Sequence, residues 1–320
     1  MKIVLLLLAF SIVALCILPI LRNSERLRLS RDTAPDAPGQ FLLLTNGPVH
    51  YQLLGPDTGP VVVLVHGFSV PSYTWEKTLP YLANRGFRVL GFDLYGRGYS
   101  ARPEVKYDRS LFVSEIAELL RALDITDRVH LVGLSMGGAI VAAFAADHTD
   151  RVQSLVLLAP FNSPTPIGPL KLPVIGELLA YSFVVPAMPG SQLEDFVEPA
   201  RYPEWADRFR VQMHYAGFRR AVLATARGFI QSDPMTDFTR VGSNEINTLL
   251  LWGDSDAMFP LSQADRVRLA LGPNAEFQLM EQAGHALHYE RAAAVNARIT
   301  EFLQAHSRTL RPRIGAETED

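Results

Sequence analysis

The sequence predicts an α/β fold, in which a mostly parallel, doubly wound sheet carries an inserted helical cap. Short apolar runs alternate with helix-like segments along the chain, which is typical of a parallel sheet with helices on both faces. The run Val61–Val65 is wholly apolar and rich in β-branched side chains, as expected for a strand buried on both faces. Residues 161–238 contain no convincing strand and are punctuated by prolines, which indicates an insertion between two strands.

The individual elements follow from apolar patterning and turn signals. Asn46-Gly47 divides the first two apolar runs and predicts a hairpin, so the sheet opens with an antiparallel pair. The expected strands cover residues 41–44, 49–54, 61–65, 87–92, 129–132, 155–158, 248–252 and 277–280. The expected helices cover residues 75–84, 111–123, 138–146, 205–229 and 292–305. The insertion at about 161–238 is interpreted as a cap over a binding site, with a functionless surface insertion as the alternative.

Composition excludes some classes of function. The chain has 320 residues, 48% of them hydrophobic, so a large core is available. A net charge of −3 gives no electrostatic case for binding nucleic acid. The single cysteine, Cys16, cannot form an internal disulfide or build a metal site.

The N-terminus is the most apolar part of the chain. From Ile3 to Leu21 only Ser11 and Pro19 interrupt the apolar run, which is long enough to cross a bilayer as a helix. We therefore expect a single-pass membrane anchor over residues 1–21 and a polar linker over 22–40. The excess of arginine after the span predicts that the domain after the linker lies on the cytoplasmic side. A signal segment, cleaved to leave a secreted or periplasmic protein, is the alternative. Residues 41–308 form the expected domain, and 309–320 a polar tail.

The central motif is Gly133-Leu134-Ser135-Met136-Gly137, between a predicted strand and a predicted helix. A strand that enters a helix through one tight turn presents a side chain at the carboxyl end of the sheet, and the two glycines leave room for that turn. Ser135 would lie at a helix N-terminus, where backbone N–H groups favour negative charge. This pattern is typical of the nucleophile elbow of serine hydrolases, and the alternative is a small turn residue.

Over about residues 41–302 the chain resembles the α/β-hydrolase superfamily. The similar motifs occur in the order expected for that family: His66-Gly67-Phe68, then Asp93-Leu94-Tyr95-Gly96-Arg97-Gly98-Tyr99-Ser100, then the elbow, then Gly253-Asp254-Ser255-Asp256-Ala257-Met258-Phe259-Pro260, and finally Gly284-His285 with Glu290 downstream.

The resemblance implies a set of catalytic roles. Ser135 is the nucleophile, His285 its base and Asp256 the acid that orients the base. His288 is the second candidate for the base, and Asp254 and Asp93 are weaker candidates for the acid.

The same resemblance places the oxyanion hole at two main-chain groups. The backbone N–H groups of Phe68 and Met136 would stabilise the negative oxygen that forms on the substrate. We find no phosphate loop or dinucleotide fingerprint, so neither cofactor nor metal is expected.

The reaction expected from the resemblance is acylation of Ser135 followed by hydrolysis of the acyl-enzyme. Serine at the elbow argues against haloalkane dehalogenases and epoxide hydrolases, whose members carry aspartate there. Apolar residues of the cap indicate a small-molecule ester with an apolar acyl chain, such as a monoacylglycerol, cleaved by a carboxylesterase or lipase. Three alternatives stay open: a carbon–carbon bond hydrolase of vinylogous diketones, a cofactor-free haloperoxidase-like enzyme, and an inactive binding protein with the same fold.

Overall fold

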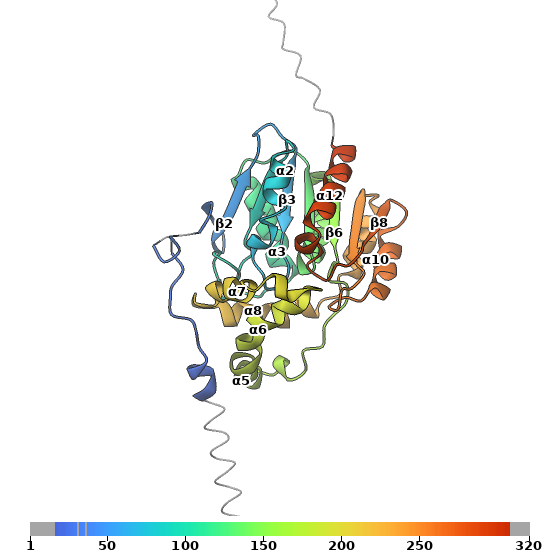
Figure 1. Cartoon of the computed structure of the whole chain (residues 1–320). Coiled ribbons are helices and arrows are strands. Elements are labelled where there is room, and N and C mark those ends of the chain that lie inside the picture. Colours follow the sequence, from blue (N-terminus) through green and yellow to red (C-terminus); the bar gives the residue numbers. More distant parts are fainter. Residues whose placement is uncertain (1–16, 31, 36, 308–320) are drawn as a thin grey trace, which may run out of the picture.

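The computed structural model describes residues 17–30, 32–35 and 37–307, and these residues form a single eight-stranded sheet (Figure 1). The strand order is β1-β2-β4-β3-β5-β6-β7-β8. The pairs β1–β2 and β2–β4 are antiparallel and all other neighbours are parallel, which confirms the mostly parallel sheet. The strands are β1 (Gln40–Leu44), β2 (Gly47–Leu54), β3 (Val61–Val65), β4 (Arg88–Phe92), β5 (Val129–Leu134), β6 (Val152–Leu158), β7 (Thr248–Gly253) and β8 (Ala275–Met280).

The middle strands have the composition of strands covered on both faces. Every residue of β3, β5 and β7 is buried. His130 is a polar residue in the middle of this region, and its Nδ1 lies 2.8 Å from Ser154 Oγ on β6. Because a buried polar group is costly without a partner, this contact explains how β5 tolerates a histidine.

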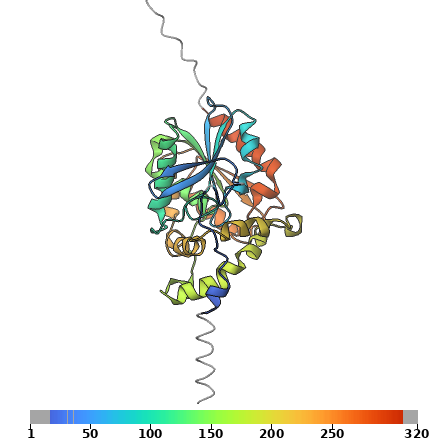
Figure 2. The same cartoon turned by 90° about the vertical axis from the view of Figure 1, so that its left-hand side faces the viewer.

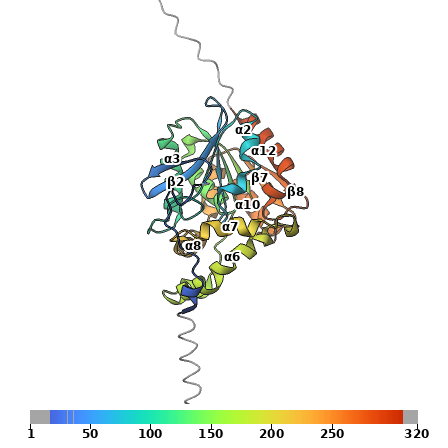
Figure 3. The ribbon, with the colours of Figure 1, turned by 60° about the vertical axis from the view of Figure 1, so that its left-hand side comes forward.

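Helices cover both faces of the sheet (Figure 3). On one face α2 (Leu79–Ala83) packs with α12 (Ala292–His306), and Thr78 Oγ1 donates to Asn296 Oδ1 at 2.8 Å. On the other face α3 packs on α4, α4 on α9 and α9 on α10. These four helices are α3 (Arg109–Ala122), α4 (Met136–Asp147), α9 (Met235–Ser243) and α10 (Ala264–Leu271). The short helix α11 (Leu287–Glu290) comes directly before α12.

The cap lies between β6 and β7 in the sequence and below the sheet in Figure 1. Its helices are α5 (Ile175–Leu179), the π-helical turn η4 (Ala180–Val184), α6 (Val185–Ser191), the 3-10 turn η5 (Gln192–Asp195), α7 (Trp205–Met213) and α8 (Phe218–Arg227). A second apolar cluster, separate from the main core, includes Trp205, Phe209 and Phe218 of the cap together with Tyr289 of α11. The helix expected over 205–229 is therefore two helices, separated at Gly217, whose φ of +91° favours glycine.

The N-terminal segment, residues 17–30 and 32–35, lies against the cap (Figure 2). The N–H of Leu27 donates to the carbonyl of His214 at 3.0 Å, and the N–H of Ala216 donates to the carbonyl of Leu27 at 2.8 Å. Arg219 on α8 binds the same segment, because its N–H donates to Glu25 Oε1 at 2.8 Å and its Nη1 to the carbonyl of Pro19 at 2.9 Å. Main-chain and side-chain contacts thus join this segment to α7 and α8.

The prediction of a membrane-spanning helix over residues 1–21 is wrong for the part of the chain that the structure describes. Among residues 17–307, apart from the gaps at 31 and 36, we find no helix with the length and hydrophobicity needed to cross a bilayer. Residues 17–21 are helical, and Arg22 follows them and donates to the carbonyl of Ser182 at 2.5 Å. The rest of the predicted span, residues 1–16, lies outside the described residues.

Candidate active site

Ser135 lies at the turn between β5 and α4, with backbone angles φ +54° and ψ −120°. A positive φ is unfavourable for a residue with a Cβ, by about 1–3 kcal/mol, and such strain is concentrated at functional sites. The surrounding main chain holds the turn: the N–H of Ser135 donates to the carbonyl of Leu158 and the N–H of Phe161 donates to the carbonyl of Ser135, both at 2.9 Å. The turn therefore presents the Ser135 side chain at the carboxyl end of the sheet.

The two glycines of the elbow are required by close approach of backbone. A Cβ on Gly137 would lie 2.2 Å from the carbonyl oxygen of Val65, and a Cβ on Gly133 would lie 2.4 Å from the carbonyl oxygen of Gly137. Both distances are far shorter than a van der Waals contact, so α4 can start this close to β3 and β5 only with glycine at these positions.

His285 lies after β8, and its Nδ1 is 2.8 Å from Asp256 Oδ2. A carboxylate oxygen accepts, so Nδ1 carries the proton and Nε2 is left as the basic nitrogen. The other oxygen, Oδ1 of Asp256, accepts from the N–H groups of Met258 and Phe259 at 2.9 and 2.8 Å. These bonds fix the orientation of the carboxylate, which in turn fixes the imidazole.

The pKa of His285 is raised above its ordinary value of 6.5. Burial opposes protonation of the ring, but the hydrogen bond and charge of Asp256, together with the charge of Asp195, outweigh it. A base of this kind is stronger than a free imidazole and takes up a proton readily.

The two weaker candidates near His285 have other contacts. Asp254 accepts from the N–H groups of Gln282 and Ala283 at 2.9 and 3.2 Å, so it ties the end of β7 to the loop that carries His285. His288 lies on α11 with Nε2 2.7 Å from Thr74 Oγ1, and burial lowers its pKa to about 3.

The groups predicted for an oxyanion hole lie beside Ser135. A Cβ on Gly67 would be 3.4 Å from the Cβ of Ser135, so the loop after β3 passes directly alongside the elbow. Neither the N–H of Phe68 nor that of Met136 donates a hydrogen bond to any described residue. Met136 is the first residue of α4, where an N–H has no partner within the helix.

Two buried side chains hold the loop of Phe68. His66 accepts from the N–H of Leu94 at 3.0 Å through Nε2, so its Nδ1 donates to the carbonyl of Gly67 at 2.8 Å. Burial lowers the pKa of His66 to about 4, which keeps the ring neutral. Arg97 is fully buried, and its Nε donates to the carbonyl of Phe68 at 2.5 Å. Sequence reasoning missed Arg97, although an arginine between Gly96 and Gly98 was a signal that the tight turn carries a buried cation.

Ser135 and His285 line one cavity of about 380 Å³, which is formed by the loops after the strands together with the cap. Phe68 and Met136 line it as well, so the cavity brings together the predicted nucleophile, base and oxyanion donors, while Asp256 lies behind His285. Most of the wall is apolar. Glu194 and Asp195 are its acidic residues, and none of the described residues that line it is lysine or arginine.

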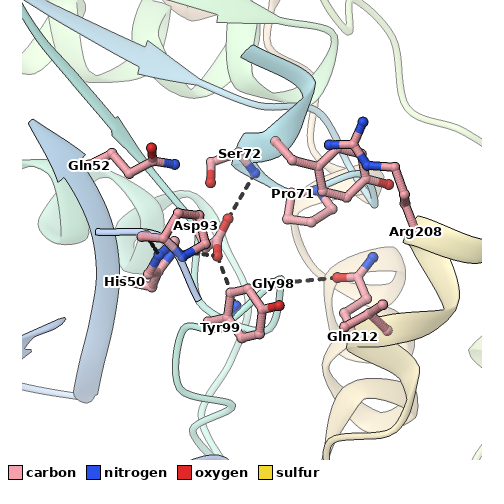
Figure 4. A pocket seen from close by; sticks show the side chains of 12 residues that line it. His50, Gln52, Pro71, Ser72, Asp93, Gly98, Tyr99, Arg208 and Gln212 are labelled. Carbon is pink, nitrogen blue, oxygen red and sulfur yellow. Dashed lines mark hydrogen bonds and ion pairs between the residues drawn. The ribbon is translucent and has the colours of Figure 1, made fainter. Parts of the chain in front are cut away.

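A second cavity, of about 210 Å³, lies beside a buried pair formed by His50 and Asp93 (Figure 4). His50 Nδ1 is 2.8 Å from Asp93 Oδ2, and the carboxylate also accepts from the N–H groups of Ser72 and Tyr99, each at 2.8 Å. A Cβ on Gly98 would lie 2.1 Å from the same carboxylate. Asp93 therefore joins β2, the start of the 3-10 turn η1 (Ser72–Trp75) and the glycine-rich turn, and none of its contacts is with His285.

Replacing Asp93 by alanine is expected to destabilise the fold by about 3–5 kcal/mol, because three buried donors lose their acceptor. Burial raises the pKa of Asp93, but His50 and the hydrogen bonds outweigh this effect and hold it below its ordinary value of 3.8. The stabilisation is thus present above pH 4 and lost as the pH falls further. Urea unfolding at pH 7 measures the change.

Asp57→Ala is the matched control for that measurement. The side chain of Asp57 is 94% exposed and forms only a 3.5 Å ion pair with Arg88, so its removal is expected to cost below about 1 kcal/mol. Equal losses of stability for the two variants would contradict a structural role for Asp93.

The chain matches known proteins over most of its length. The sequence profile of the alpha/beta hydrolase fold matches residues 60–292. A 2-hydroxy-6-oxononadienedioate/2-hydroxy-6-oxononatrienedioate hydrolase of Cupriavidus pinatubonensis is 30% identical over 288 residues, which are 82% of this chain and 94% of that protein.

Similar solved structures include a thermophilic esterase from Thermogutta terrifontis, with a TM-score of 0.72 and 26% identity over 84% of this chain and 100% of that one. A bromoperoxidase from Bacillus anthracis has a TM-score of 0.69 and 26% identity over 83% of this chain and 99% of that one. With the sheet, the elbow and the family match together, the chain belongs to the alpha/beta hydrolase fold family.

Proposed function

We propose that this chain is a serine hydrolase that cleaves carboxylic esters with an apolar acyl chain, such as monoacylglycerols, through an acyl-enzyme on Ser135. One observation carries the proposal: Ser135 and the hydrogen-bonded pair His285–Asp256 converge on one mostly apolar cavity. A hydroxyl, a basic imidazole and an orienting carboxylate are the groups that this chemistry requires.

The reaction follows from the roles of these groups. His285 Nε2 takes the proton of Ser135 as Oγ attacks the ester carbonyl, and the N–H groups of Phe68 and Met136 donate to the oxyanion. The same proton passes from His285 to the departing alcohol, which leaves the acyl group on Ser135. Water then loses a proton to His285, attacks the acyl carbon and releases the acid as Ser135 regains its proton.

The cavity favours an apolar acyl group. Its volume of about 380 Å³ is within the usual range of sites for small molecules. Side chains of the cap and of the loops that follow the strands form its apolar wall: Phe161, Ile167, Leu170, Val184, Val185, Leu223, Ile230 and Met258. Each methylene buried against such a wall contributes about 0.8 kcal/mol, which is close to a fourfold gain in affinity.

The carbon–carbon bond hydrolase is less well supported by this cavity. A dienedioate, named for the relative from Cupriavidus pinatubonensis, has two carboxylates. Carboxylate recognition usually relies on arginine or lysine, and neither lines the cavity among the described residues. Cleavage of a vinylogous diketone would favour the carbon–carbon bond hydrolase. Bromination in the presence of hydrogen peroxide would favour the haloperoxidase-like enzyme.

A series of 4-nitrophenyl esters from acetate to dodecanoate tests the proposed substrate class. We expect kcat/KM to rise with each methylene over the first several carbons and then to level off as the apolar wall is filled. Release of 4-nitrophenol gives the rate, with Ser135→Ala as the blank. A sharp preference for acetate would reject the lipid-like substrate, and the absence of any ester cleavage would reject the esterase itself.

A further inference from the structure

Asp195 of the cap lies against the loop that carries His285. It ends the turn η5, and its carbonyl accepts from the N–H of Ala286 at 3.0 Å. A Cβ on Gly284 would lie 2.6 Å from the same carbonyl oxygen, so the two segments are in close contact. Asp195 also lines the cavity that contains Ser135 and His285. An acidic residue of the cap is thus held at the catalytic centre.

The Asp195 carboxylate has no partner that would neutralise it. Within the described residues, no hydrogen bond or ion pair reaches its oxygens. Asp256, which is also acidic, already accepts from His285, Met258 and Phe259. An unpaired carboxylate in a partly buried wall is costly and projects its charge into the cavity.

No cationic side chain lines the cavity among the described residues, and Arg97 lies behind Phe68 outside the lining. Glu194 is the neighbouring residue on η5 and is acidic, and Glu290 on α11 is occupied by the N–H groups of Gly284 and Val197 at 2.7 and 2.8 Å. His288 is neutral, because burial lowers its pKa to about 3. The charged side chains that line the cavity are therefore acidic unless His285 is protonated.

We propose that Asp195 determines charge specificity, so that its carboxylate disfavours esters with an anionic alcohol and favours neutral and cationic ones. The inference rests on the proposed ester hydrolysis and names the class of ester that the site selects. For charges about 10 Å apart at an effective dielectric constant near 20, the expected discrimination is about tenfold per unit charge.

Two matched pairs of phenyl hexanoates separate charge from shape. The 3-trimethylammoniophenyl ester is compared with the 3-tert-butylphenyl ester, and the 3-carboxyphenyl ester with the 3-carbamoylphenyl ester. For each pair the ratio of kcat/KM in the wild type is divided by the ratio in Asp195→Asn, which cancels the intrinsic reactivity of the esters. We expect a quotient of about 10 for the cationic pair and about 0.1 for the anionic pair.

Two further variants serve as controls. Asp207→Asn makes the same chemical change on α7, where the side chain is 80% exposed, and should leave both ratios at their wild-type values. Asp195→Glu keeps the charge and should keep the discrimination, which separates charge from any loss of folding in Asp195→Asn.

The dependence on pH adds a readout that a structural role for Asp195 would not give. Burial raises its pKa to about 6, with Asp256, Glu194 and Glu290 acting in the same direction and His285 opposing them. The side chain is therefore charged above pH 6 and neutral below it. We expect the ratio of kcat/KM within each ester pair to move closer to 1 in the wild type as the pH is lowered from 7.5 to 5. The change should be smaller in Asp195→Asn, in which only the other groups titrate.

The outcomes distinguish this inference from the proposed function. Equal ratios in the wild type and Asp195→Asn, with all esters cleaved, would overturn charge specificity and leave the esterase intact. Failure of the wild type to cleave any of the four esters would overturn the proposed function, and the inference with it.

Discussion

Replacing Ser135 by alanine is expected to lower kcat for ester hydrolysis by about 10⁶-fold. The variant lacks the only side chain of the elbow that can form an acyl intermediate, while the fold keeps its oxyanion donors and cavity. Steady-state rates with 4-nitrophenyl hexanoate measure the loss. Labelling by a fluorophosphonate probe should disappear in parallel, because the probe reacts with an activated serine hydroxyl.

Ser110→Ala is the matched control for this experiment. Ser110 is exposed, and its hydroxyl donates to Asp108 at the start of α3. Ser110 is not among the residues that line the cavity. Full labelling and full activity are expected for it. Retention of labelling by Ser135→Ala would move the nucleophile to another residue and would undo the proposed reaction.

Replacing Asp256 by asparagine is expected to lower kcat by about 10⁴-fold with little change in stability. The amide oxygen can still accept from the N–H groups of Met258 and Phe259, so the amide NH₂ is turned toward His285 Nδ1. Nδ1 must then act as the acceptor, which places the proton on Nε2. An imidazole in this tautomer cannot take the proton of Ser135.

Asp254→Asn tests the competing candidate for the acid. Its hydrogen bonds from the N–H groups of Gln282 and Ala283 hold the loop before His285 and do not touch the imidazole, so we expect a loss below about tenfold. Urea unfolding of both variants shows whether the fold is retained. A loss for Asp254→Asn as large as that for Asp256→Asn would contradict the assignment of the acid.

The central sheet was predictable because its strands are short apolar runs rich in β-branched residues. The run Val61–Val65 coincides with β3, since five consecutive apolar residues, four of them valine, favour a strand that is buried on both faces. Helices α9 and α10 were not predicted. Both mix charged and apolar residues, and their apolar side chains, such as Phe238 and Val267, form a buried face only when the helix packs against its neighbours.

The cap was harder to predict in detail. Its prolines were interpreted as breaks, yet α5, η4 and α6 follow one another directly, with Pro186 and Pro189 inside α6. The π-helical turn η4, which departs from regular α-helical hydrogen bonding, comes immediately before them. The local sequence also gives no sign that Asp195 lies beside the loop of His285. The two residues are 90 positions apart in the chain, and the contact is a hydrogen bond from the N–H of Ala286 to the carbonyl of Asp195. Long-range contacts of this kind depend on the assembled fold.

The attachment of residues 17–30 and 32–35 to α7 and α8 links this segment to two helices that contribute to the wall of the cavity containing Ser135 and His285. Any outward swing of those two helices has to carry the segment along or break the pairing of Leu27 with His214 and Ala216. A spectroscopic reporter on this segment, for instance at the exposed Ser30, would therefore report movement of α7 and α8 without changing any residue that lines the cavity.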